Sequence, residues 1–213
     1  DIISKISKRK LKFYNITLSI KFVRRVMRKF FIIFMIAVLF PISFSNYSFG
    51  VELVKKLIEL GSCPKCDLSG ADLIAAHLKR ADLNGANLSR ANLSGVNFAE
   101  AKFTNADLSN ANLASANLNE AQLGGANLRR ADLSSASLKL AYLYRADLSG
   151  ANLSGANFSG ADLRYVNLKW ADLRGAKFIE TDITNAIVKK ENLRVAILCK
   201  TKTSWGEDNS GCK

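Results

Sequence analysis

A five-residue repeat organises the chain, because one apolar residue recurs at every fifth position. These central positions run from Leu68 to Leu198 without insertion or deletion and make 27 repeats, with 21 leucines, four phenylalanines, one isoleucine and one valine. Alanine lies two residues before the central position in 22 repeats, and Asp or Asn lies one residue before it in 19. This spacing would scatter the leucines around an α-helix and alternate them between the faces of a strand. The backbone must therefore turn a corner at every repeat, so that each leucine points to a common axis.

Four such sides close a square coil, and successive coils can stack through backbone hydrogen bonds. The pattern A(D/N)LXX over residues 66–200 resembles the pentapeptide-repeat family, in particular its exported cyanobacterial members. The resemblance implies an all-β fold, the right-handed quadrilateral β-helix. Leucine on the axis and alanine near the corners suit this fold, since they fill the interior and leave no lumen for a ligand. With coils ~4.8 Å apart, the rod would be roughly 32 Å long.

The two ends of the repeat region differ from its middle. Val51–Leu60 is amphipathic and precedes Gly61, which predicts a short capping helix over residues 51–62. We expect the β-helix over residues 63–200 and a C-terminal capping tail over residues 201–213. Because open backbone edges invite pairing, end-to-end stacking into a dimer is a further expectation.

Residues 1–50 form a basic leader, which contributes +9 to the net charge of +13. Basic residues precede the apolar run Phe30–Phe40, and a serine-rich stretch follows, an order typical of a signal peptide. We therefore predict export to the periplasm or thylakoid lumen. The alternative is a protein that an uncleaved leader anchors in a membrane. Met27 stands just before Arg28 and Lys29, so residues 1–26 are expected to lie upstream of the true start.

Four cysteines form two pairs, Cys63 with Cys66 and Cys199 with Cys212, at opposite ends of the predicted rod. A disulfide needs Cα atoms within ~7 Å, so the rod excludes bridges between the pairs and a zinc site shared by all four. We predict two local disulfides as structural staples, with a redox-active CxxC at Cys63 and Cys66 as the alternative. Similar exported family members carry paired cysteines near their caps, and this resemblance supports the staples.

The sequence lacks the residue combinations of an active site. His77 is the only histidine and occupies an outward Asp/Asn position, where we expect a solvated side chain. The aspartates recur by the rule of the repeat, and they can accept bonds from the local backbone at turns. We therefore predict no enzyme, no cofactor, no metal and no small-molecule substrate.

Positive charge and aromatic residues gather in the second half of the repeats. Residues 66–128 have a net charge of −2, and residues 129–200 of +5. One coil is twenty residues, so Tyr144 should lie beside Arg164, and Arg145 beside Tyr165. Exposed Tyr, Trp and Arg are typical of interface hot spots, which predicts a patch for a protein partner; a merely solvated surface is the alternative. The predicted patch comprises Tyr142, Tyr144, Arg145, Arg164 and Tyr165 on one face, with Lys169 and Trp170 on another.

These features favour a non-enzymatic structural or protein-interaction module, an exported rod whose protein partner is unknown. The alternative is a cytoplasmic, topoisomerase-modulating DNA mimic, a role that the family resemblance implies through its quinolone-resistance members. Such mimics present an acidic face, whereas residues 51–213 have a net charge of +4. We do not expect nucleic acid as a partner, and we expect a membrane only through an uncleaved leader.

Overall fold

The computed structural model describes residues 44–212 and divides the chain into two units, Asp1–Ser48 and Phe49–Lys213. All the repeats belong to the second unit. Most of the predicted leader, including Met27 and the apolar run Phe30–Phe40, lies outside the described residues. Within residues 44–212, no helix combines the length and the apolar character that a membrane crossing requires.

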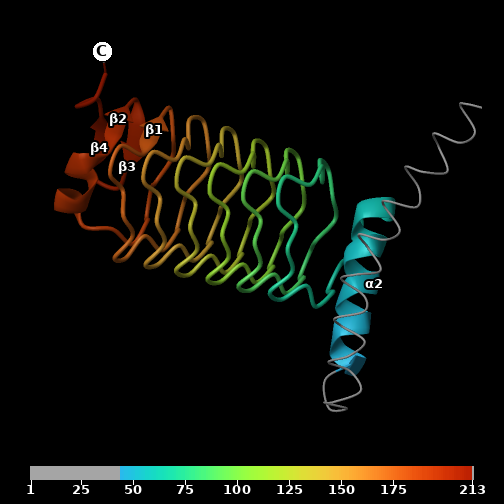
Figure 1. The fold of residues 1–213 in the computed structure, drawn as a ribbon. Helices are drawn as coiled ribbons and strands as arrows, with labels where there is room; N and C mark the ends of the chain where they lie inside the picture. Colours follow the sequence, from blue (N-terminus) through green and yellow to red (C-terminus); the bar gives the residue numbers. More distant parts are fainter. Residues whose placement is uncertain (1–43, 213) are drawn as a thin grey trace, which may run out of the picture. The chain divides into compact units, whose positions relative to one another are not determined.

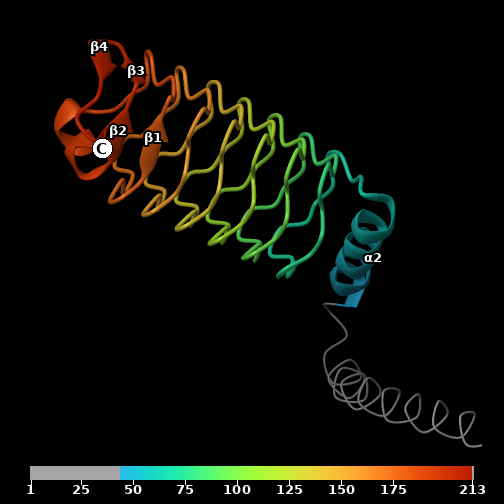
Figure 2. The ribbon, with the colours of Figure 1, turned by 90° about the horizontal axis from the view of Figure 1, so that it is seen from above.

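The repeats form a right-handed quadrilateral β-helix, which confirms the fold class predicted from their period. Each side pairs in parallel with the side twenty residues further on, as Asn87 pairs with Asp107. The N–H of Leu88 donates to the carbonyl of Asp107 (2.6 Å), and the N–H of Asn87 donates back to the carbonyl of Cys66 (2.9 Å). Figures 1 and 2 show the coils as similar loops stacked along one axis.

The four sides are named here by their central residues. Side 1 is centred on Cys63 and on every twentieth residue after it; sides 2, 3 and 4 begin in the same way at Leu68, Leu73 and Leu78. A corner is named by the two sides that it joins. Every residue of the β-helix can thus be placed by its position within a coil.

The interior of the β-helix is a single apolar column. Central residues and the alanines two positions before them belong to one buried cluster, as Leu118 and Ala116 do in the middle of the chain. Phenylalanines use the same column, and the rings of Phe158 and Phe178 stack with their centroids 5.2 Å apart. Each buried side-chain nitrogen or oxygen of the described residues has a hydrogen-bond partner. The core is therefore closed to ligands, and only the outer surface is available for function.

Each corner is a tight turn with one residue in the left-handed region. The N–H of Ala71 donates to the carbonyl of Leu68 (3.0 Å), and Gly70 between them has a φ of 66°, as type II turns require. Bulky residues adopt the same conformation, including Tyr165 and Trp170 with φ of 60° and 62°. This conformation costs a non-glycine residue roughly 1–2 kcal/mol, which the stacking of coils offsets.

The Asp or Asn before each central residue caps the following turn. Asp107 Oδ1 accepts the backbone N–H of Ser109 (2.9 Å), and it also accepts Asn127 Nδ2 of the next coil (3.0 Å). One side chain therefore satisfies its own corner and ties two coils together. The recurrence of these residues is explained by structure, as the sequence predicted.

Helix α2 (Phe44–Leu60) begins before residue 51, the predicted start of the capping helix. Gly50 does not interrupt it, because a glycine within a helix costs only about 1 kcal/mol relative to alanine. Gly61 has a φ of 62° and donates its N–H to the carbonyl of Leu57 (2.8 Å), which ends the helix. The helix residues that join the core or pack against it are Leu53, Val54 and Leu57.

Four short strands and a 3-10 helix form the C-terminal end. Strand β1 (Lys177–Ile179) pairs in parallel with β2 (Ile197–Cys199), and β3 (Thr201–Thr203) pairs in antiparallel fashion with β4 (Gly206–Asp208). The 3-10 helix η1 (Lys190–Val195) lies between β1 and β2 in the sequence and takes the place of side 3 of the last coil, with the corner residues that flank it. Figure 1 shows these strands together at the end of the stack.

The β-helix continues beyond residue 200, where the sequence predicted the tail to begin. Lys202 pairs in parallel with Asp182, while Thr201 and Thr203 occupy the alanine and leucine positions and are buried. The hydroxyl of Thr201 donates to the carbonyl of Phe178. The apolar pattern could not reveal this repeat, because its inward residues are threonines that bond to the backbone.

Candidate interaction surface

Four residues of the predicted patch lie on the corner between sides 1 and 2. Tyr144 and Arg145 are the two corner residues of one coil, and Arg164 and Tyr165 are those of the next. The N–H of Arg145 donates to the carbonyl of Arg164 (3.1 Å), which fixes the two corners against each other. The order of Tyr and Arg is reversed between the coils, so each ring has a guanidinium beside it.

Three tyrosine rings form a continuous cluster at this corner. The Tyr142 and Tyr144 rings stack with centroids 6.1 Å apart, and the Tyr144 and Tyr165 rings meet edge to face at 5.5 Å. The guanidinium of Arg145 lies 5.2 Å from the centroid of the Tyr144 ring, and the guanidinium of Arg164 lies 5.7 Å from the same centroid. Such cation–π contacts hold the rings in place. We call these five residues the tyrosine–arginine cluster.

The cluster combines exposure with a fixed geometry. Tyr142 is 45% exposed and Tyr165 is 47% exposed, while Tyr144 between them is half-buried. Tyr142 lies across Gly124 of the preceding coil, where a Cβ atom would come within 2.9 Å of its ring. A glycine at that position is therefore required for the ring to lie against the coil.

The two arginines of the cluster differ in their electrostatic pairing. Arg164 forms a two-point ion pair with Asp162, with Nε 2.8 Å from Oδ1 and Nη2 2.7 Å from Oδ2. These bonds lower the pKa of Asp162 and raise the pKa of Arg164. Arg145 has no ion pair among residues 44–212. Its charge remains available to a partner.

Lys169 and Trp170 stand apart from the tyrosine–arginine cluster. They occupy the corner between sides 2 and 3, so the predicted seven-residue patch is divided between two corners. Lys169 Nζ lies 4.1 Å from the centroid of the Trp170 ring, which is 74% exposed. The pair borders a hollow of 430 Å³ on the last coil.

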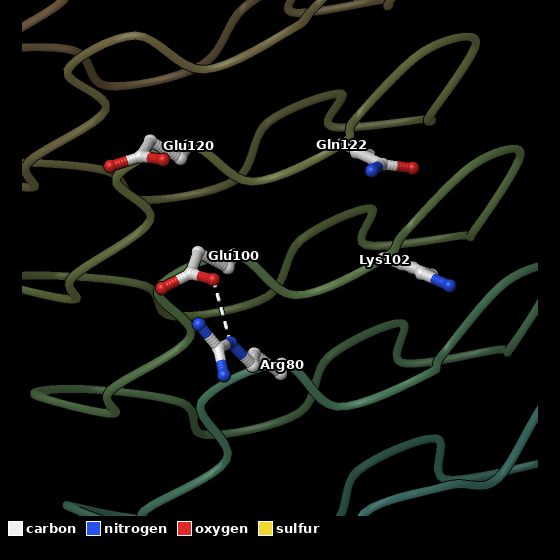
Figure 3. A pocket seen from close by; sticks show the side chains of 5 residues that line it. All are labelled: Arg80, Glu100, Lys102, Glu120 and Gln122. Atoms are coloured by element: carbon white, nitrogen blue, oxygen red, sulfur yellow. Dashed lines mark hydrogen bonds and ion pairs between the residues drawn. The ribbon is translucent and has the colours of Figure 1, made fainter.

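A second, charged hollow of 460 Å³ lies on side 1 and the corner before it, in the first half of the β-helix. Arg80 Nε donates to Glu100 Oε2 (2.6 Å), and Lys79 Nζ lies 3.0 Å from Glu100 Oε1. These partners lower the pKa of Glu100. Figure 3 shows Glu120 one coil beyond Glu100, whereas Lys102 points away from the carboxylates. Both signs of charge mix here, so the hollow lacks a uniform field for one kind of ligand.

Sequence reasoning missed this hollow, although a signal was present. Lys102 and Gln122 replace Asp or Asn on side 1, and Tyr142 follows in the same column one coil later. Three consecutive coils thus depart from the repeat at the outward position of side 1.

Comparison with known proteins is consistent with the geometry described above. The family model for pentapeptide repeats matches residues 66–105, 106–143 and 141–178, with eight copies. The chain belongs to the pentapeptide-repeat family. A search of curated proteins found no match.

Solved pentapeptide-repeat structures are similar to this chain. HetL, involved in heterocyst differentiation regulation in the cyanobacterium Nostoc sp. strain PCC 7120, is 32% identical over 68% of this chain and 71% of its own, with a TM-score of 0.30. Rfr23 of the cyanobacterium Cyanothece 51142 is 29% identical over 65% of this chain and 99% of its own, with a TM-score of 0.42. QnrB1, a plasmid-mediated fluoroquinolone resistance protein, is 26% identical over 67% of this chain and 81% of its own, with a TM-score of 0.35.

In this pentapeptide-repeat protein the cysteines are joined locally at the two ends of the β-helix. Cys63 and Cys66 form a disulfide across the first corner with Cα atoms 5.5 Å apart, and Cys199 and Cys212 form another at 4.8 Å. Cys63 is completely buried in the core. A buried sulfur at the first central position is suited to a structural role, since a redox-active thiol must be reached by its substrate.

The described surface offers little to catalysis. His77 is exposed in the Asp/Asn column of side 4, as expected. Within residues 44–212, no group of three His, Cys, Asp or Glu side chains is arranged to hold a metal ion. The carboxylates with lowered pKa values are held by arginine or by turn hydrogen bonds, as Asp172 is by Arg174.

Proposed function

We propose that this protein is a non-enzymatic interaction rod that docks a protein partner through the tyrosine–arginine cluster. The observation that carries the proposal is the cluster of three tyrosine rings in which Arg145 and Arg164 both lie against the ring of Tyr144. Tyrosine and arginine are over-represented among the residues that dominate binding energy. The cluster stands on hydrogen-bonded corners, so little conformational entropy remains to be lost on binding.

We further propose that the protein works outside the cytoplasm, in the periplasm or thylakoid lumen. The basic leader with its apolar run supports export, and an uncleaved leader would instead anchor the rod to a membrane. The two disulfides support an oxidising compartment, where such bonds persist. Cell fractionation with a blot for the processed chain tests this location; an unprocessed cytoplasmic chain would contradict it.

The charge distribution argues against a DNA mimic that acts on a topoisomerase. Such a protein needs an extended acidic face, whereas residues 129–200 have a net charge of +5. The acidic side chains of this region are partly neutralised, as Asp162 is by Arg164. A partner with acidic residues of its own fits the exposed Arg145 better than a basic DNA-binding groove does.

Site-specific photo-crosslinking in the source cells tests the cluster directly. A photoreactive side chain at Tyr165 should give one dominant adduct, whereas the same group at Ser115, on the corner between sides 3 and 4, should not. The double variant Tyr144→Ala/Tyr165→Ala should prevent that adduct from a probe at Arg145 without lowering the thermal stability.

The matched control is Ser94→Ala/Ser115→Ala, which changes the same two corner positions on the opposite corner. This control should leave the adduct unchanged. Equal adducts from the Tyr165 and Ser115 probes, or an adduct that survives the double tyrosine variant, would contradict the proposal.

A further inference from the structure

The C-terminal end of the β-helix is covered on three of its four sides. Strand β4 lies against side 1, and η1 takes the place of side 3. Residues 209–212 cover side 4, where the N–H of Gly211 donates to the carbonyl of Leu198 (2.7 Å) and Cys212 is bonded to Cys199. On side 2, no later segment of the described chain forms a β-bridge with residues 186–189, and the one later bond is from the N–H of Asn192 in η1 to the carbonyl of Lys189 (3.0 Å).

The open side arises where the sequence departs from the repeat. In the preceding coil Asn167 Oδ1 accepts the N–H of Lys169 (3.1 Å). Ile187 replaces the Asn in the last coil, so the N–H of Lys189 has no hydrogen-bond partner among the described residues. The N–H of Trp170 also has none, because η1 displaces the carbonyl that the next corner would present.

These unpaired groups border the hollow of 430 Å³ on side 2. Its apolar surface is contributed by Trp170, by Ile187, which is 58% exposed, and by the half-buried Val188. Exposed apolar side chains that adjoin one another mark interaction sites more often than isolated ones do. The hollow is therefore suited to a ligand that supplies both apolar surface and acceptors.

The charges around the hollow define the sign of that ligand. Lys169 and Lys189 line it, and neither forms an ion pair with any residue of the described chain. Glu191 is the one acidic residue among the lining side chains of the hollow. A carboxylate could thus accept hydrogen bonds from two ammonium groups and from the two unpaired amides. Hydrogen bonds to an ionised carboxylate are charge-assisted and stronger than those between neutral groups.

We propose that this hollow binds one extended segment of a partner protein in which a carboxylate side chain neighbours an aliphatic residue. The carboxylate accepts from Lys169, Lys189 and the free N–H groups, while the aliphatic side chain covers Trp170 and Ile187. The proposal rests on the proposed interaction role and gives it a second contact, separate from the tyrosine–arginine cluster.

The covered sides decide between a single segment and a second copy of the chain. Coil-on-coil stacking would need all four sides open, but β4, η1 and residues 209–212 occupy three of them. Only the width of one side remains, which fits one extended segment. End-to-end dimerisation at this end is therefore disfavoured.

Tryptophan fluorescence of the full chain tests the proposal, since Trp170 and Trp205 are its two tryptophans. In a Trp205→Phe background, Trp170 is the sole reporter. The probe is a capped eight-residue peptide of alternating valine and glutamate, and the comparison peptide has glutamine in place of glutamate. We expect a saturable blue shift with the first peptide and at least tenfold weaker binding of the second.

Variants in the same background separate the site from the fold. Ile187→Asn should pair the Lys189 N–H as Asn167 pairs Lys169, so it should keep or raise the thermal stability and weaken peptide binding at least tenfold. Lys169→Ala should weaken binding about tenfold, whereas Lys139→Ala, the same charge change on another corner, should not alter it.

Three results would overturn the proposal. They are equal binding of the two peptides, full binding by Ile187→Asn, and a dimer in sedimentation that Ile187→Asn dissolves, which would make a second copy the occupant. The Tyr144→Ala/Tyr165→Ala variant should still bind the peptide. If this variant loses the photo-crosslink to the partner but still binds the peptide, the two contacts are independent. The crosslink then reports on the tyrosine–arginine cluster alone.

Discussion

The buried threonines near the C-terminal end provide a sharp test of how this fold closes. Thr181 and Thr201 both occupy inward alanine positions and are completely buried. The hydroxyl of Thr181 donates to the carbonyl of Phe158 (2.8 Å), and that of Thr201 donates to the carbonyl of Phe178. Replacing either residue by valine keeps the shape of the side chain and removes one donor.

Both carbonyls stay paired after the substitution. The carbonyl of Phe158 also accepts the N–H of Ala161 (2.9 Å), so Thr181→Val leaves it satisfied. The carbonyl of Phe178 lies within the parallel pairing of β1 with β2, so Thr201→Val leaves it in a paired strand. A lost hydrogen bond whose acceptor is still paired costs about 0.5–1.5 kcal/mol.

Thermal unfolding followed by circular dichroism measures these losses. At roughly 2–4 °C per kcal/mol for a chain of this size, a loss of about 1 kcal/mol in either variant lowers the Tm by about 2–4 °C. Hydrogen exchange should show the opening caused by Thr201→Val in β2 and β3. The reasoning is refuted if either variant matches the parent protein, or if one of them loses more than about 2 kcal/mol, the cost of an acceptor left unpaired.

Three further predictions concern the core, the cluster and the end. Leu118→Ala empties a completely buried position in the middle of the stack and should cost about 3–5 kcal/mol in a urea titration. Arg164 lowers the pKa of Asp162, so the ionised carboxylate of Asp162 stabilises the fold at pH values above its unfolded pKa. This contribution is lost as the pH falls through the lower pKa of the folded state. NMR titration should show that the pKa of Asp162 rises in Arg164→Ala. Reduction of the Cys199–Cys212 disulfide, worth about 3 kcal/mol in the chain-entropy model, should expose residues 206–212 to protease while the middle coils stay protected.

Most of the β-helix could be predicted from its sequence, because the period and the residue types point to the same coil. A step of twenty residues placed Tyr144 beside Arg164 and Arg145 beside Tyr165, and the structure has these rings and guanidinium groups in contact. Such neighbours follow from arithmetic once the coil is known. The five-residue period likewise places Lys169 and Trp170 one corner after Arg164 and Tyr165, as the structure has them.

The ends were harder to predict, for reasons that particular residues make clear. Thr201 and Thr203 continue the coil, but as threonines they do not match the apolar pattern of the repeat. Their hydroxyls donate to the backbone carbonyls of Phe178 and Gly206. At Ile187 the repeat looks only slightly altered, yet the missing Asp/Asn side chain coincides with the place where η1 replaces the corner. Helix α2 extends past Gly50, because a single glycine does not end a helix that is otherwise favourable.

The left-handed corner residues have a consequence for how such a surface can change. Within residues 44–212, eighteen corner positions with positive φ carry side chains other than glycine, from alanine to tryptophan. Their backbones are held by neighbouring coils, and their side chains point to solvent without supporting the core. The position of each corner on the surface is therefore fixed by its residue number, while the side chain at that corner is free to vary. Single substitutions at the corners can therefore build a new recognition surface without changing the β-helix that carries them.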